Sequence, residues 1–442
     1  MSKNKKIKRP NPFVWMIMIL YLIGASIFRR KVKITFKTRD GKILGERQAR
    51  KALKKIKAPF VLLGNHHSLY DYIFPMRALF PRRINFMVAR KHVIASPFRF
   101  FLKYSYTIPK SLFQTDIPAI RGAFDVIAQK GILAIYPEGQ ILVNGISKQM
   151  PEQVSKLLKK FKVPVIIQRT SGAYFVDSTW RRKLPKGLIE VEFFEALTSE
   201  ELAKYSLAEI DEIVAKSLYV DNFKWQEETG NLYVGKKRAE GLENILYMCP
   251  CCQKEFSLKT DDDKIICTNC NTKVTYNQAC HFEWEKEKYF NHIGEWYAYQ
   301  NQIEKERHFQ NRELNLTIPV EVKILAEKNT LIKESNDFEI RKTKRIEKGG
   351  RGNLIITREK IMYKGEIFGK DAEIRFNPRA VQYLPYTPGD NFQIYLQDVM
   401  FAFHPIDSRF CAKAALTIET LYEFLEIKRK KDPDWGKFGL FE

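Results

Sequence analysis

Two histidines and an aspartate stand between an apolar run and an aromatic one in "LLGNHHSLYDYIF", residues 62–74. Four residues separate His66 from Asp71, so a turn can bring the carboxylate back onto the imidazole. An imidazole paired in this way is held in one tautomer and can act as a general base. The preceding "FVLLGN" predicts a buried strand. The pair would then lie at the carboxyl end of that strand, where open α/β sheets bind ligands.

The same residues permit a structural interpretation. Ser68 and Asp71 have the spacing of a capping box that would open the helix "LYDYIF", and His67 can simply pack in the core. Spacing alone does not choose between the two interpretations. A capped helix would also hold a His66–Asp71 pair rigid.

A second segment, "AIYPEGQI" at residues 134–141, ends another predicted strand in a turn that would present Glu138 at the same edge of the sheet. Together the two segments resemble the glycerolipid acyltransferase family, whose members acylate 1-acylglycerol-3-phosphate. The family's His-x-x-x-x-Asp block matches His66 and Asp71, and its Phe-Pro-Glu-Gly-Thr-Arg block matches residues 136–139 as Tyr-Pro-Glu-Gly. An apolar strand with Val-Pro-Val matches 163–165, and the resemblance spans roughly residues 55–190.

The resemblance implies a mechanism. His66 would remove the proton from an acceptor hydroxyl, and Asp71 would orient His66. The hydroxyl would attack an acyl thioester carried by coenzyme A or acyl carrier protein, so acyl-CoA or acyl-ACP is the expected co-substrate. Glu138 and Gly139 would contact substrate, and backbone amides near the Gly139 turn would stabilise the oxyanion.

The sequence departs from the family where the acceptor's phosphate would bind. Ile141 replaces the arginine of the third block, and the aromatic second block that usually ends in Arg is approximated by "YTIPK" with Lys110. Lys110 and Arg121 are the predicted substitute cations, although Arg121 also fits a solvated helix face. The expected acceptor is lysophosphatidate, and the alternative is an acceptor without a phosphomonoester.

Five of the seven cysteines lie between Cys249 and Cys270. Cys249, Cys252, Cys267 and Cys270 form two Cys-x-x-Cys pairs 14 residues apart, which is typical of a zinc ribbon with a closed structural Zn²⁺ site. The additional Cys251 leaves some ambiguity about which two cysteines form the first pair. Redox-active cysteines are the alternative interpretation, but redox chemistry does not need two pairs at ribbon spacing.

The net charge of +24 favours a polyanionic partner, such as nucleic acid, an anionic membrane or phosphorylated substrates. A nucleic-acid- or protein-binding zinc-ribbon protein on an acyltransferase-like scaffold is therefore the alternative function. The acidic "TDDDK" beside the ribbon disfavours a nucleic-acid partner, because it would repel phosphates.

The N-terminal segment has an uncharged run from Phe13 to Phe28 between basic clusters. It is short for a transmembrane helix, which needs about 20 residues, so it predicts a retained anchor, partly inserted or barely spanning. A buried core helix is the alternative. With no cleavable signal expected, the protein would lie at the cytoplasmic face of the cell membrane, with membrane lipids and lysophospholipid as partners. The basic, aromatic "RKHVIASPFRFFLKYSY" could also dock on lipid.

The elements that would position these residues alternate short apolar runs with helical patterns, which predicts an α/β fold. The resemblance makes it a glycerolipid-acyltransferase-like αβα layered domain. We expect a membrane anchor at 1–35, this acyltransferase domain at 36–215, a connector at 216–246 and a four-cysteine zinc ribbon at 247–280. A helical segment and a small, mainly antiparallel β domain with a terminal helix would occupy 281–442. The stretch that begins with "SEEL", residues 199–202, is helical in pattern and starts with the Ser-x-x-Leu of Ser199, without a capping box.

Overall fold

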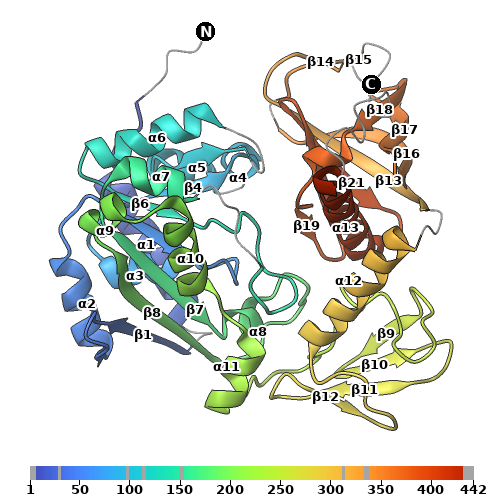
Figure 1. The fold of residues 1–442 in the computed structure, drawn as a ribbon, viewed down its shortest axis with the longest axis horizontal. Helices are drawn as coiled ribbons and strands as arrows, with labels where there is room; N and C mark the ends of the chain where they lie inside the picture. The colour runs from blue at the N-terminus through green and yellow to red at the C-terminus, as the bar shows by residue number, and fades with distance from the viewer. Residues whose placement is uncertain are drawn as a thin grey trace. The chain divides into compact units, whose positions relative to one another are not determined.

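The computed structural model describes residues 6–27, 31–95, 99–111, 116–148, 154–310, 314–332, 338–343 and 345–431. The chain divides into two compact units (Figure 1). The first is built from Met1–Thr179, Leu184–Gly235 and Gln278–Cys280, and the second from Trp180–Lys183, Lys236–Asn277 and His281–Glu442. Each unit has its own sheets and its own hydrophobic core.

The first unit contains an eight-stranded sheet with the order β2-β1-β8-β7-β3-β6-β4-β5. Its strands are β1 (Lys31–Lys37), β2 (Ile43–Leu44), β3 (Phe60–Gly64), β4 (Ile84–Ala89), β5 (Ile108–Lys110), β6 (Ile132–Ile135), β7 (Val165–Ser171) and β8 (Leu188–Leu197). β7, β3, β6, β4 and β5 are parallel, whereas β8 is antiparallel to β7. Every residue of β3 is buried, as expected for a strand covered on both faces. The predicted α/β unit with parallel strands is confirmed.

Helices cover this sheet. They are α1 (Pro12–Ile27), α2 (Glu46–Lys55), α3 (Ile73–Leu79), α4 (Arg90–Ala95), α5 (Arg99–Tyr104), α6 (Ile117–Ala128), α7 (Val154–Phe161), α8 (Ala173–Asp177), α9 (Ser199–Lys204), α10 (Leu207–Leu218) and α11 (Asn222–Thr229). Side chains of α6, α7, α9 and α10 share one core with odd-numbered strand residues such as Val61 and Leu133. The even-numbered Leu62 and Ala134 are equally buried, so the opposite face is covered as well.

The helix predicted as an anchor is α1, which packs against α3. Trp15 and Ile19 are buried, whereas Phe13 and Leu20 are each 65% exposed. No helix within the described ranges is long and apolar enough to cross a membrane. α1 combines a face packed in the unit with an exposed apolar face.

The helical stretch from residue 200 consists of two helices, α9 and α10, because Tyr205 is extended. Both begin with a capping box, Thr198 with Glu201 and Ser206 with Glu209. The prediction that this stretch lacks a capping box is therefore wrong. It placed the first cap at Ser199, whereas Thr198 is the residue that accepts the N3 amide.

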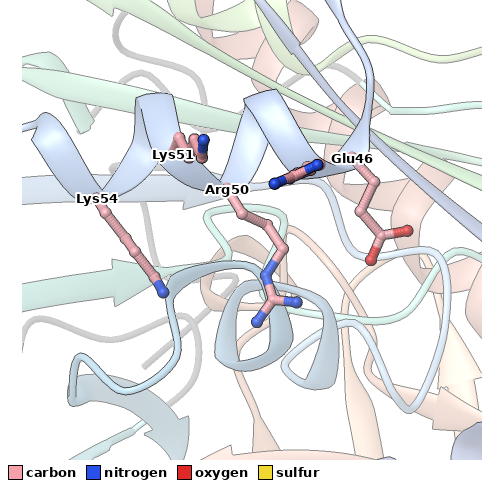
Figure 2. A pocket seen from close by; sticks show the side chains of 5 residues that line it. Glu46, Arg50, Lys51 and Lys54 are labelled. Atoms are coloured by element: carbon pink, nitrogen blue, oxygen red, sulfur yellow. The ribbon is translucent and has the colours of Figure 1, made fainter.

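A basic hollow of about 550 Å³ lies along α2 (Figure 2). Its lining residues are Glu46, Arg47, Arg50, Lys51 and Lys54. The carboxylate of Glu46 pairs with Arg77 of α3 at 2.7 Å, so the acid in the hollow is already neutralised. The hollow includes none of the residues predicted to do chemistry.

The second unit begins with η1 (Leu242–Asn244) and a small antiparallel sheet in the order β12-β11-β10-β9. Its strands are β9 (Leu258–Asp261), β10 (Lys264–Cys267), β11 (Lys273–Tyr276) and β12 (Phe282–Trp284). The predicted ribbon segment ends at residue 280, but β12 lies beyond it and pairs with β11. The helix α12 (Ile293–Phe309) follows.

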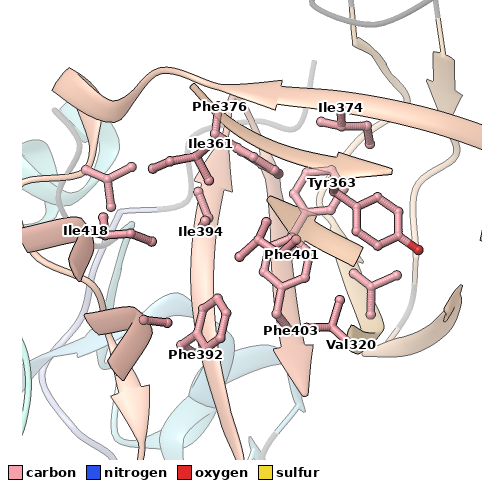
Figure 3. Close-up of a cluster of buried hydrophobic side chains, with 14 of the residues drawn as sticks. Val320, Ile361, Tyr363, Ile374, Phe376, Phe392, Ile394, Phe401, Phe403 and Ile418 are labelled. Atoms are coloured by element: carbon pink, nitrogen blue, oxygen red, sulfur yellow. The ribbon is translucent and has the colours of Figure 1, made fainter. Parts of the chain in front are cut away.

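The rest of the second unit is an antiparallel sheet in the order β18-β17-β16-β13-β21-β20-β19. Its elements are β13 (Asn315–Ala326), β16 (Glu347–Thr357), β17 (Ile361–Ile367), β18 (Lys370–Phe376), η2 (Pro378–Ala380), β19 (Tyr386–Thr387), β20 (Asn391–Leu396) and β21 (Val399–Pro405), with a separate hairpin β14 (Thr330–Ile332) and β15 (Phe338–Ile340). The terminal helix α13 (Phe410–Lys431) places Ile418 in the same buried apolar cluster as sheet residues such as Ile394 and Phe401 (Figure 3). An antiparallel β domain with a terminal helix is what the alternating pattern predicts.

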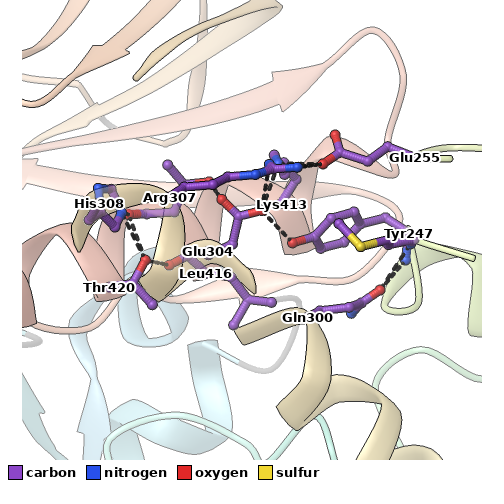
Figure 4. A network of polar contacts seen from close by, with 11 residues as sticks. Tyr247, Glu255, Gln300, Glu304, Arg307, His308, Lys413, Leu416 and Thr420 are labelled. Atoms are coloured by element: carbon purple, nitrogen blue, oxygen red, sulfur yellow. Dashed lines mark hydrogen bonds and ion pairs between the residues drawn. The ribbon is translucent and has the colours of Figure 1, made fainter. Parts of the chain in front are cut away.

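A buried ionic network joins α12, α13 and the ribbon segment (Figure 4). Glu304 accepts from Lys413 Nζ at 2.6 Å and from the Tyr247 hydroxyl at 2.9 Å. Lys413 also contacts Glu255, at 2.8 Å, and Glu255 pairs with Arg307. Glu255 lies only three residues after Cys252, so the ribbon and the helical core share one network of charges, of which Glu304 and Lys413 are buried.

Candidate active site and metal centre

The carboxyl ends of four neighbouring parallel strands form one edge of the first unit's sheet. β3 lies next to β6, β6 next to β4, and β4 next to β5. The residues that follow these strands carry the predicted chemistry: His66 after β3, Glu138 after β6, and Lys110 at the end of β5.

His66 and Asp71 form a pair at this edge. The Nδ1 atom of His66 lies 3.1 Å from Oδ2 of Asp71. The Asp71 side chain is fully buried, whereas that of His66 is 25% exposed. Burial raises the pKa of the Asp71 carboxyl, and its hydrogen bonds act in the opposite direction. With Nδ1 engaged, Nε2 of His66 is the nitrogen left to accept a proton, since no residue that the structure describes hydrogen bonds to it.

The loop that holds the pair is organised by Asp71 and not by a helix cap. Oδ2 of Asp71 also accepts the backbone N–H groups of His67, at 2.7 Å, and Ser68, at 2.8 Å. The Ser68 hydroxyl accepts from Tyr70 N, and α3 begins only at Ile73. The capping-box prediction is therefore wrong about the helix. The same two side chains instead close a tight loop that brings the carboxylate onto His66.

His67 has a structural role. It is fully buried, with Nε2 3.1 Å from Ser147 Oγ and Nδ1 3.1 Å from Asn222 Nδ2. Burial lowers the pKa of His67 to about 3, so the ring is neutral at ordinary pH. An amide donating to Nδ1 leaves the proton on Nε2, and the ring ties the loop to α11.

The Tyr-Pro-Glu-Gly turn packs directly on the pair. The rings of Tyr136 and His66 lie 5.2 Å apart between centroids. The Glu138 carboxyl group accepts the backbone N–H of His66, and burial raises the pKa of Glu138 to about 8. Gly139 has φ +71°, which favours glycine, and its own N–H donates to Tyr136 O at 3.3 Å. The Gly139 amide is thus used inside the turn, and the next amides along, of Gln140 and Ile141, donate to no group in the part of the chain that the structure describes.

The two cations predicted to bind the acceptor's phosphate, Lys110 and Arg121, differ in burial and in position. Lys110 is half-buried at the end of β5, donates to Ser111 O at 3.0 Å, and has a pKa lowered by burial. Arg121 lies on the exposed side of α6, and no contact with His66 or Asp71 brings it into the pair. Ile141 is half-buried in the loop after the Gly139 turn.

Sequence reasoning missed three polar residues of this edge. Arg90 follows β4 directly, one residue after Ala89, which is the register partner of Lys110, and pairs with Asp116 at 2.7 Å. Gln168 of β7 is fully buried and donates to the backbone oxygen of Asp71 at 3.1 Å. Asn222 comes from the predicted connector and holds His67. A glutamine at the end of the apolar run "VPVIIQ" indicates a buried polar side chain that needs a partner, whereas nothing in the sequence pattern singles out Asn222.

Four cysteines of the second unit converge. The Sγ atoms of Cys249, Cys252, Cys267 and Cys270 all lie within 4.8 Å of one another. The Cys249–Cys270 and Cys252–Cys267 distances are 3.7 and 3.8 Å. Four thiolates about 2.3 Å from one Zn²⁺ at tetrahedral angles would lie about 3.8 Å apart, so the donor set and its geometry fit zinc. Cys251 is exposed and is not among the four cysteines of the cluster.

No protein-family model matches the chain. A probable translation initiation factor IF-2 of Methanobrevibacter smithii is 88% identical over 24 residues, which are 5% of this chain and 4% of that protein. The chain therefore spans only a small fraction of that protein. The crystal structure of the 1-acyl-sn-glycerophosphate (LPA) acyltransferase PlsC from Thermotoga maritima has a TM-score of 0.36 and 16% identity, covering 49% of this chain and 78% of that chain. A score at this level does not establish a shared fold, so a function for this chain has to come from its own residues.

Proposed function

We propose that the chain is an acyltransferase that moves a fatty acyl group from an acyl thioester to the hydroxyl of a lysophospholipid. The observation that carries the proposal is the His66–Asp71 pair, which stands after β3 with Nδ1 engaged and Nε2 left for a proton. The Glu138 turn, from the second segment of the family resemblance, contacts the backbone of the same histidine.

In the proposed reaction, Nε2 of His66 takes the proton of the acceptor hydroxyl as its oxygen attacks the thioester carbonyl. The carbonyl oxygen becomes negatively charged, and backbone amides after Gly139 are the proposed donors to it. The intermediate then collapses with loss of the thiolate, which takes the proton from the His66 imidazolium. Asp71 stabilises that imidazolium and holds the tautomer. The products are an ester and a free thiol of coenzyme A or acyl carrier protein.

The proposed acceptor is 1-acylglycerol-3-phosphate, with Lys110 as a cation for its phosphate. Two features of the first unit support a place at an anionic membrane surface on the cytoplasmic side. They are the exposed apolar face of α1, with Phe13 and Leu20, and the basic hollow of α2. The cysteine cluster is proposed to hold a structural zinc ion.

The test incubates purified protein and vesicles with labelled acyl-CoA or acyl-ACP and a panel of acceptors: lysophosphatidate, other lysophospholipids and neutral monoacylglycerol. We expect label in phosphatidate. Equal labelling of monoacylglycerol would favour an acceptor without a phosphomonoester, as Ile141 permits. No labelled lipid with any acceptor, together with retention on nucleic acid at physiological salt, would replace the proposal by the zinc-ribbon binding function.

A further inference from the structure

The side chains of Tyr136 and Gln168 meet above Gly64, across three strands of the sheet. Gly64 ends β3 and is the register partner of Gln168 on β7, while Tyr136 follows β6 on the other side of β3. The Tyr136 hydroxyl donates to Oε1 of Gln168 at 3.3 Å. A Cβ on Gly64 would lie 2.4 Å from Tyr136 Cε1, so glycine is what lets the tyrosine ring cross this strand.

The hydrogen bond between Tyr136 and Gln168, called the bridge below, connects to the His66–Asp71 pair through both of its residues. Nε2 of Gln168 donates to the backbone oxygen of Asp71 at 3.1 Å, and the Tyr136 ring lies against His66, 5.2 Å between centroids. Gln168 is fully buried, and burial raises the pKa of Tyr136 well above its ordinary value. The hydroxyl is therefore a permanent donor, and its direction of donation is fixed.

The hydrogen bond between Tyr136 and Gln168 accounts for the presence of both polar side chains. Tyr136 is partly buried and Gln168 is fully buried, and a polar group removed from water without a hydrogen-bond partner is costly. Each supplies the group that the other requires.

We propose that Gly64, Tyr136 and Gln168 are positioning residues. They hold His66 and Asp71 in a fixed position relative to the Glu138 turn. This inference builds on the proposed function. The bridge would act on the rate of the chemical step and not on acceptor affinity, because neither the Tyr136 nor the Gln168 side chain needs to touch the acceptor. Misplacement of a reacting group by about 1 Å can cost about a hundredfold in rate.

The test compares Tyr136→Phe, Gln168→Met and the double variant with Tyr233→Phe. Tyr233 is a matched control, since its buried hydroxyl also makes one bond, to Leu188 O at 3.0 Å, elsewhere in the same unit. We expect kcat to fall about tenfold for Tyr136→Phe and about ten- to a hundredfold for Gln168→Met, with KM for the acceptor unchanged. The double variant should be no slower than Gln168→Met, because the two residues act through one contact.

A second measurement does not depend on activity. Spectra of protein labelled with ¹⁵N-histidine report the His66 tautomer, and we expect a single Nδ1-protonated form in the wild type and in Tyr233→Phe. Tyr136→Phe and Gln168→Met should show a mixture of tautomers. An unchanged His66 spectrum in both bridge variants would overturn the inference, as would unchanged kcat in an active enzyme. If the wild type transfers no acyl group at all, the proposed function fails and the spectra alone decide the positioning role.

Discussion

Replacing Asp71 by Asn or by Ala separates what its charge does from what its oxygen does. Oδ2 of Asp71 accepts from Nδ1 of His66 and from the buried amides of His67 and Ser68. The asparagine variant keeps an oxygen for the two amides but loses the charge. The alanine variant loses both.

The expected loss of rate for Asp71→Asn follows from the charge pair. Two unit charges about 4 Å apart interact by about 4 kcal/mol at an effective dielectric constant of 20. His66 is 25% exposed, so water screens part of this, and we take about 2–3 kcal/mol as the imidazolium stabilisation lost. That corresponds to a fall in kcat of about 30- to 150-fold.

The expected loss of stability differs between the two variants. Asp71→Ala leaves two buried N–H groups without an acceptor, at about 1–3 kcal/mol each. For a unit of about 150–250 residues, each kcal/mol lowers Tm by about 2–4 °C. We therefore expect Tm to drop by more than about 5 °C for Asp71→Ala and by less than that for Asp71→Asn.

The assay is release of free thiol from acyl-CoA in the presence of lysophosphatidate, beside thermal unfolding of the same preparations. Asp177→Asn is the matched control, because Asp177 is also buried and accepts from the same loop, through Ser68 Oγ at 3.0 Å, without touching His66. Its rate should stay within about threefold of wild type. An Asp71→Asn enzyme that folds and retains more than a third of the wild-type rate would refute the assigned role of the carboxylate.

Three further predictions concern groups outside the pair. Because the folded pKa of Glu138, about 8, lies above its ordinary 4.5, stability from the neutral form is complete below the ordinary value and is lost as pH rises through about 8. Unfolding by denaturant from pH 5 to 9 should show this decline in wild type, and an equally steep decline in Glu138→Gln would contradict it. Lys110→Ala should raise KM for lysophosphatidate about ten- to a hundredfold, since a charge-assisted hydrogen bond is worth about 1.5–3 kcal/mol, and should leave neutral acceptors unaffected. Arg121→Ala, on the exposed side of α6, is its control, and equal effects of both variants would argue against a specific phosphate contact. Metal analysis should find one zinc per chain in wild type and none in Cys267→Ser, and chelation should lower the Tm of the second unit because Glu255 of the ribbon belongs to the buried network of Glu304 and Lys413. Full zinc content in Cys267→Ser would count against the ribbon site.

The sequence predicted elements better than it predicted contacts. The apolar run of β3 and the Cys-x-x-Cys spacing are local patterns, and the structure has both the buried strand and the converged cysteines. Helix starts near residues 73 and 199 were misplaced, because Ser, Thr and Asp side chains close loops and cap helices with the same spacing.

The less predictable part of the site comes from residues far apart in the chain. Gln168 contacts the Asp71 backbone across 97 residues, and Asn222 contacts His67 across 155. Neither contact leaves a periodic pattern, since each depends on the strand order and on how the chain returns to the sheet. Arg90 was visible only as part of a basic run until β4 and β5 were paired in register.

The role of His66 as general base is the central claim, and His66→Ala measured against His404→Ala tests it most directly. His404 lies on β21 of the second unit, with Nδ1 3.0 Å from Asp390 Oδ1, and has no assigned role, so its loss should change kcat less than about threefold. A positioned general base contributes about 10²–10⁴-fold, so His66→Ala should lower acyl transfer to lysophosphatidate by at least about a hundredfold with Tm unchanged. A folded His66→Ala protein that loses less than about tenfold in rate would contradict the account.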